Sequence, residues 1–163
     1  MVPRLFGAAA LLAAGLLSVS AWAQTPTAPT PRSPAEEAFL AAKSKNCPKC
    51  DLHDANLARR DLSGADLSGA NLRGAQLVEA NLASANLEDA TLIEADLSAA
   101  SMRQAKLKGA RMHLATLYLT DLTLADMTDV YMESGMMRRA RMQRVNLTGA
   151  YLIDSNQIGR AHV

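Results

Sequence analysis

Two cysteines in the stretch Cys-Pro-Lys-Cys are the residues of this 163-residue chain whose types and spacing most directly suggest chemistry. Cys47 and Cys50 can form a structural disulfide or act as a redox-active pair, because two intervening residues suit both roles. Redox-active pairs of this kind lie at the start of a helix, which lowers the thiol pKa. Here the pair follows a segment with the pattern of a helix. We predict a structural disulfide and keep the redox pair as the alternative.

Methionine is the second residue type that suggests chemistry, because soft thioether sulfur can bind Cu(I). Six methionines of the second half are spaced by five residues or multiples of five: Met102, Met112, Met127, Met132, Met137 and Met142. Met136 lies outside this spacing. If the six side chains point inward, they are flexible core filler, and this is our interpretation. Copper binding is the alternative.

Arginines are concentrated near the C-terminal end, at Arg138, Arg139, Arg141 and Arg144. Residues 50–101 contain nine acidic and three basic side chains, a balance of −6, whereas residues 102–163 contain five acidic and nine basic ones, a balance of +4. The four arginines form either a solvated face or a contact for an anionic partner. The sequence favours neither interpretation.

Catalytic patterns are lacking in the sequence. It contains no glycine-rich phosphate loop, no nucleophile elbow and no convincing metal-ligand spacing. Carboxylates such as Asp61 and Asp66 recur in one regularly repeated slot, which indicates a structural role. We predict that the protein is not an enzyme and uses neither a cofactor nor a metal.

A period of five residues organises most of the chain. Leucine or methionine occupies all 21 positions from 52 to 152 in steps of five, and alanine fills most positions two residues earlier. On an α-helix a step of five turns the side chain through about 500°, and on a strand an odd step reverses its direction. A short extended segment followed by a bend instead points the alanine and the central residue to one side. The pattern therefore predicts a repeat array in which each unit forms one wall of a coil.

The units Ala-Asn-Leu-Ala-Arg, Ala-Asp-Leu-Ser-Gly and Ala-Asn-Leu-Arg-Gly resemble the Ala-(Asp/Asn)-Leu-x-x motif of the pentapeptide-repeat family. The resemblance covers about two thirds of the chain. It implies an all-β fold, a right-handed four-sided parallel β-helix (a solenoid) with four units per coil and about five coils. Arg60 takes an alanine position in the first coil, so we expect its side chain to leave through the end of the tube.

Residues 1–23 combine a basic start, an apolar run and the small-x-small sequence Ala-Trp-Ala. This order is typical of a secretory signal peptide. No later segment is apolar enough to cross a bilayer. We expect an exported protein, periplasmic or extracellular, with no membrane span after signal cleavage.

The remainder divides into segments of different composition. Ser33 and Glu36 form a candidate capping box at the start of a helix. We predict four segments: a Pro/Thr-rich disordered linker (24–34), a capping helix (35–46), the solenoid (47–155) and a C-terminal tail (156–163).

Apolar residues accumulate at outward or corner positions in the second half of the array. Single exposed apolar residues are normal, but an accumulation indicates a contact surface. The candidate partner surface comprises Leu114, Tyr118, Leu119, Leu124, Tyr131 and Met136. We expect a protein partner of unknown identity or a homodimer through the C-terminal half, and no nucleic acid.

Three functions follow as hypotheses. The first is a non-enzymatic interaction or structural scaffold outside the cytoplasm, because a solenoid offers a rigid surface without a cleft. The second follows from the resemblance, which implies kinship with DNA mimics that bind gyrase. The third is a thiol-redox or copper-handling protein, which depends on Cys47, Cys50 and the methionines.

Overall fold

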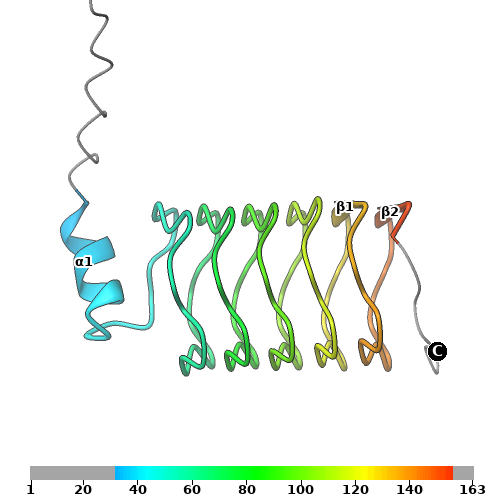
Figure 1. Ribbon diagram of the computed structural model, residues 1–163, viewed down its shortest axis with the longest axis horizontal. Helices are drawn as coiled ribbons and strands as arrows, with labels where there is room; N and C mark the ends of the chain where they lie inside the picture. Colours follow the sequence, from blue (N-terminus) through cyan, green and yellow to red (C-terminus); the bar gives the residue numbers. More distant parts are fainter. Residues whose placement is uncertain (1–31, 156–163) are drawn as a thin grey trace, which may run out of the picture. The chain divides into compact units, whose positions relative to one another are not determined.

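The computed structural model describes residues 32–155. The predicted signal peptide, most of the predicted linker and the predicted C-terminal tail lie outside these residues. Residues 32–155 form one helix, α1 (Pro34–Leu40), and two short strands, β1 (Tyr131–Glu133) and β2 (Tyr151–Ile153). Between α1 and the end of β2 the chain winds into a tube of stacked coils (Figure 1). In this part of the chain, no helix has the length and apolarity that a bilayer span requires.

Residues twenty positions apart pair along the tube. Parallel bridges run from Asp51 with Asn71 to Asp126 with Asn146, and β1 pairs with β2 in the same register. Four five-residue units therefore complete one coil, which gives the tube four sides. Most units contribute a single bridging residue, because a turn follows the central residue at once. For this reason only two segments of residues 32–155 are long enough to count as strands.

The tube is filled by the side chains that the period of five places inside it. Central residues such as Leu87 and Met112 are fully buried, and so are the alanines two positions before them, Ala85 and Ala110. Thr120 replaces alanine at one such position and is also buried, with its hydroxyl donating to the carbonyl of Leu97 at 2.8 Å. The interior is thus an apolar column in which even a rare polar group is hydrogen-bonded.

A turn forms the corner after each central residue. In the unit of Leu87, the N–H of Ala90 donates to the Leu87 carbonyl at 3.1 Å. The second turn residue, Asp89, has a φ of 56°. Such left-handed backbone costs a non-glycine residue on the order of 1 kcal/mol. At the corners, non-glycine residues therefore adopt a left-handed backbone that is unfavourable by itself but gives the coil its four-sided shape.

Polar side chains before the central residues stabilise these turns and join the coils. The Asp61 carboxylate accepts the N–H of Ser63 at 3.2 Å, and the Asn81 amide, one coil later, donates to the same oxygen at 3.1 Å. The same pair of contacts recurs around Asp66. The frequent Asp and Asn of the motif therefore act as backbone acceptors, as expected for these residues beside turns.

Gly74 occupies a corner that needs glycine for two reasons. Its φ is +64°, and the carboxylate of Asp54, one coil earlier, occupies the space where a β-carbon would lie. Gly64 has the same φ, but nothing lies within 4 Å of its β-carbon position. We expect Gly74→Ala to lower the free energy of unfolding by about 0.5–1 kcal/mol more than Gly64→Ala, because only Gly74→Ala forces the exposed Asp54 carboxylate to turn aside. Urea denaturation measures the difference. Adding Asp54→Ala should remove this difference between the two glycine variants. Equal losses of stability in Gly74→Ala and Gly64→Ala would contradict the close approach of Asp54 to Gly74.

Helix α1 is shorter than the predicted range of 35–46. It begins at Pro34 because Ser33 and Glu36 form the expected capping box, with the Ser33 N–H donating to Glu36 Oε2 at 2.7 Å. It ends at Leu40, since Ala42 adopts a φ of 57° that no helix continues. The N–H of Lys43 then donates back to the Ala38 carbonyl at 2.9 Å, so a local left-handed cap forms this end of the helix.

Candidate functional site

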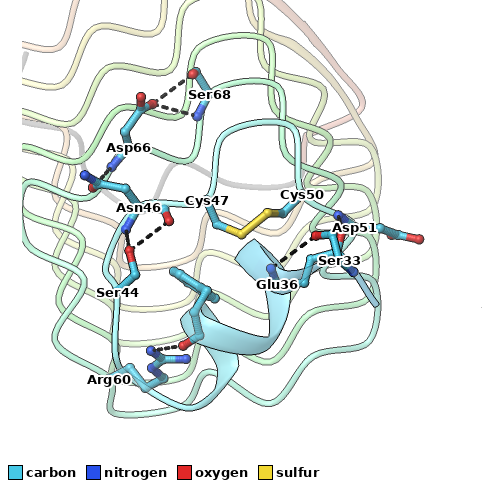
Figure 2. The surroundings of a disulfide bond; sticks show 11 residues. Ser33, Glu36, Ser44, Asn46, Cys47, Cys50, Asp51, Arg60, Asp66 and Ser68 are labelled. Carbon is cyan, nitrogen blue, oxygen red and sulfur yellow. Dashed lines mark hydrogen bonds between the residues drawn. A yellow bond between two sulfur atoms is a disulfide. The ribbon is translucent and has the colours of Figure 1, made fainter. Parts of the chain in front are cut away.

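The two cysteines form a disulfide at the N-terminal end of the tube, with Cα atoms 5.4 Å apart (Figure 2). Cys50 takes an alanine position, and Cys47 takes the central position of one further unit, five residues before Leu52. The backbone of Cys47 already follows the coil register, because its N–H donates to the Asp66 carbonyl at 2.8 Å. Counting back by five from Leu52 would have revealed this place in the sequence. The disulfide therefore links two inward positions across a corner.

This disulfide is shielded from solvent. Cys47 is 0% and Cys50 5% exposed, whereas thiol exchange requires an attacking thiolate to reach a sulfur atom. We expect glutathione to leave the bond intact in the native protein, so that thiol titration finds free thiols only after denaturation with a reductant. Removing the bond by Cys47→Ala with Cys50→Ala should lower the free energy of unfolding by about 2 kcal/mol, because the loop that it closes is short. Rapid reduction of the native protein would instead favour a redox role.

Contacts between α1 and the first coil surround Phe39. The Phe39 ring is 0% exposed, and the Arg60 guanidinium carbon lies 4.6 Å from the ring centroid. Arg60 also donates from Nη2 to the Phe39 carbonyl at 2.7 Å (Figure 2). The side chain therefore leaves its alanine position toward the end of the tube, as the sequence predicts. Burial lowers the pKa of Arg60, but a guanidinium stays protonated in proteins.

Two side chains supply acceptors to the outer edge of the first coil. Glu36 Oε1 accepts the N–H of Asp51 at 2.9 Å, and Asn46 Oδ1 accepts the N–H of Asp66 at 2.9 Å. Elsewhere in the tube the carbonyl of a preceding coil fills this role, as when Cys50 accepts from Asn71. The N–H groups of Asp51 and Ser33 lower the pKa of Glu36, so the acceptor is a carboxylate at neutral pH.

The methionines at central positions point into the tube. Met102, Met112, Met127 and Met132 are 0% exposed, so their sulfur atoms cannot meet a copper ion unless the coils separate. Met136, outside the five-residue spacing, is 50% exposed. The burial agrees with the interpretation as core filler.

The six residues of the candidate partner surface are all exposed. Tyr118 and Met136 lie on one side of the tube, and Leu114 and Leu119 lie at the two corners of that side. Tyr131 lies on the preceding side, where its ring approaches that of Tyr151 with centroids 6.3 Å apart. The structure therefore gathers four of the six, whereas Tyr131 and the more distant corner residue Leu124 stand apart from them.

The four arginines are also exposed, but they do not form one patch. Arg138 shares the side of Tyr118, and Arg139 follows at the corner, where its Nη1 lies 3.3 Å from the Tyr118 hydroxyl. Arg141 lies on the next side and Arg144 at the corner after it. A stretch that is continuous in sequence thus becomes a basic band around part of the tube.

The described side chains favour binding of a partner over catalysis. Among residues 32–155, no three side chains of His, Cys, Asp or Glu are grouped to hold a metal ion. The interior is occupied by leucine, methionine and alanine. What the described residues offer a partner is their outer surface.

A tube with a corner at every fifth residue and a register of twenty residues defines a class, the four-sided β-solenoids. The chain belongs to the pentapeptide-repeat family, whose members fold as right-handed quadrilateral β-helices. The family profile "Pentapeptide repeats (8 copies)" matches residues 50–89 and 85–123. This confirms the resemblance of the Ala-(Asp/Asn)-Leu-x-x units.

Solved structures of the family are similar to this chain. The pentapeptide repeat protein alr5209 from Nostoc PCC 7120 is 30% identical, with 72% of this chain and 92% of that chain covered and a TM-score of 0.46. Rfr23 from the cyanobacterium Cyanothece 51142 is 24% identical, with 71% and 92% covered and a TM-score of 0.67. QnrB1, a plasmid-mediated fluoroquinolone resistance protein, is 24% identical, with 63% and 62% covered and a TM-score of 0.37. No curated protein matches the chain.

Proposed function

We propose that the protein is an exported, non-enzymatic scaffold that binds a partner protein through the C-terminal half of its tube. One observation carries this proposal: within residues 32–155, the exposed large apolar side chains all lie between Leu114 and Ile153. Apolar surface confined to one half of a rod is unfavourable in water, and contact with a partner removes it from water.

Export is supported by two independent features. Residues 1–23 have the pattern of a secretory signal peptide. The disulfide of Cys47 and Cys50 is typical of proteins that fold in an oxidising compartment. We infer a periplasmic or extracellular location.

We also infer that α1 closes the N-terminal end of the tube. Phe39 covers the apolar column, and Glu36 and Asn46 occupy the edge where another coil would otherwise pair. An open edge of this kind invites pairing with other chains. Closing it leaves the C-terminal half as the surface for partners.

A gyrase-directed DNA mimic finds less support in the described surface. A mimic of DNA needs a continuous acidic surface, but the exposed arginines at 138, 139, 141 and 144 form a basic band. The redox and copper hypotheses are weakened by the burial of both cysteines and of the central methionines. We therefore propose neither as a second function.

Fractionation of the cells, followed by affinity capture from the exported fraction, tests the scaffold. Because Tyr118 and Tyr131 lie on different sides, Tyr118→Ser and Tyr131→Ser should be compared separately with Ile93→Ser, which changes the acidic half. We expect at least one tyrosine variant to lose captured proteins that Ile93→Ser retains. A cytoplasmic location, or identical capture by all variants, would overturn the proposal.

A further inference from the structure

One side of the tube carries fewer charges than the other three. We call it the Tyr118 side. Its outward residues are the neighbours of the central residues 57, 77, 97, 117 and 137: Asn56, Ala58, Gln76, Val78, Asp96, Ser98, Thr116, Tyr118, Met136 and Arg138. Bridges from Asn56 to Gln76, and onward to Met136, stack them in register. Between its corners the charged residues are Asp96 and Arg138, whereas the side that follows has four: Asp61, Arg103, Asp121 and Arg141. Its corners carry further charges, among them Glu94 in the coil of Asp96 and Arg139 in the coil of Arg138.

The corners of the Tyr118 side carry leucines in unfavourable places. Leu114 and Leu119 have φ values of 56° and 59° and are 44% and 46% exposed. A left-handed backbone costs a leucine on the order of 1 kcal/mol, and exposure forgoes the gain from burial. In the isolated tube each residue therefore gains only part of the stabilisation that full burial would give. Contact with another molecule would bury the rest of their surface.

Leu114, Tyr118 and Leu119 form an apolar row across this side at one level of the tube, with the half-buried Thr116 between Leu114 and Tyr118. Asp96 precedes that level by one coil and Arg138 follows it by one coil, as their numbers and the register of twenty residues require. The two charges therefore lie at matching heights above and below the row, and they have opposite signs. A surface with this arrangement is complementary to itself.

We propose that a second copy of this chain docks on the Tyr118 side, with the two tubes antiparallel and related by a two-fold axis that runs along the apolar row. Such an axis places each row residue against its own counterpart, as an isologous interface requires. It also brings Arg138 of each copy to the level of Asp96 of the other. The proposal names one partner for the proposed scaffold, and in this sense it rests on the proposed function. The dimer itself can be tested whether or not the protein binds other partners.

The charge pair is within reach in this arrangement. Asp96 and Arg138 lie on opposite edges of the side, two residues apart along a strand, or about 7 Å. An extended arginine side chain covers a distance of this order. Complementary charges at the rim of an apolar contact fix orientation more than they add affinity. Here they select the antiparallel orientation, because in a parallel pair arginine would face arginine.

The neighbouring side with Tyr131 is less suited to a second copy. The hydroxyl of Tyr131 donates to Glu133 Oε2 at 3.1 Å, and His113 Nδ1 lies 3.7 Å from the same oxygen. These groups already pair with one another along the tube. A two-fold axis along the row of Tyr131 would place Glu133 against Glu133 of the second copy, so that like charges would meet. The Tyr118 side is therefore the one that a second copy fits.

Sedimentation of the purified protein tests the proposal directly. We expect a dimer at micromolar concentration, and Tyr118→Cys should form a covalent dimer on oxidation, because residue 118 meets its counterpart at the axis. Tyr131→Cys is the matched control and should stay non-covalent. A monomer at all concentrations, or equal cross-linking of both variants, would overturn the proposal. Monomeric protein that still captures exported partners would leave the scaffold function standing.

Charge reversal tests the orientation. Asp96→Arg and Arg138→Asp should each weaken the homodimer about 100-fold, because both symmetric pairs become like-charged. A mixture of the two single variants should form a heterodimer with near-native affinity, since every arginine then meets an aspartate. Asp96→Ala removes the acceptor of the Ser98 N–H, which donates to Asp96 at 2.9 Å, as Asp96→Arg also does, and therefore controls for loss of this turn contact. Failure of the mixture to associate, while both variants melt normally, would overturn the antiparallel arrangement.

Discussion

Leu87→Lys is expected to abolish the cooperative melting of the tube. Leu87 is 0% exposed, and the central residues of the coils on either side, Leu67 and Leu107, are equally buried. A lysine between them has no route to water, and burying its charge costs several kcal/mol. That cost is comparable to the whole stability of a typical domain, about 5–15 kcal/mol. Thermal melting followed by circular dichroism measures the effect.

Leu124→Lys is the matched control for this experiment. Leu124 undergoes the same chemical change at an exposed corner away from the Tyr118 side, with a φ of 63°. We expect its melting temperature to stay close to that of the wild type. If Leu87→Lys melts as Leu124→Lys does, or if the wild type gives a mostly helical spectrum, the filled tube is not the fold of this protein.

The period of five was enough to predict which side chains fill the tube. Leucine and alanine alternate with polar residues in a way that neither a helix nor a long strand can bury, so the direction of residues such as Leu92 and Ala90 follows from geometry. The role of Asp61 and Asn81 could be anticipated as well, because Asp and Asn bind backbone groups beside turns. These features could be predicted because they depend on contacts within one five-residue unit or between units of the same pattern.

Features that depend on contacts between unlike segments could not be predicted in the same way. The end of α1 at Leu40 depends on the left-handed backbone of Ala42, which an alanine does not signal in the sequence. Cys47 lies five residues before Leu52 and so fits the spacing of the central positions. It is easily missed there, because every central residue from 52 to 152 is leucine or methionine. Likewise, the candidate surface and the arginines were grouped by sequence position, whereas the coil distributes successive units over four sides.

The two ends of the described tube differ in how they treat apolar surface. At the N-terminal end, where we infer that α1 closes the tube, Leu52, Cys47 and Phe39 are buried. Toward the other end, Tyr118, Met136 and Tyr151 place apolar groups outside. If the proposed closure and the proposed binding half both hold, only the C-terminal half of the tube is open to partners. The closure itself is open to a direct test.

Phe39→Ala is expected to lower the free energy of unfolding by about 3–5 kcal/mol, the usual cost of removing a buried aromatic ring. The loss should be concentrated at the N-terminal end, because the Phe39 ring lies against Arg60 and is 0% exposed. Chemical denaturation measures the total, and hydrogen exchange should show earlier opening of Leu52 and Leu57 than of Leu107. Phe39→Leu keeps an apolar group at the same place and should retain most of the stability, which separates simple coverage of the column from the contact of the ring with the guanidinium. If Phe39→Ala unfolds as the wild type does, α1 does not close the tube, and the proposed division between a sealed end and a binding half would have to be abandoned.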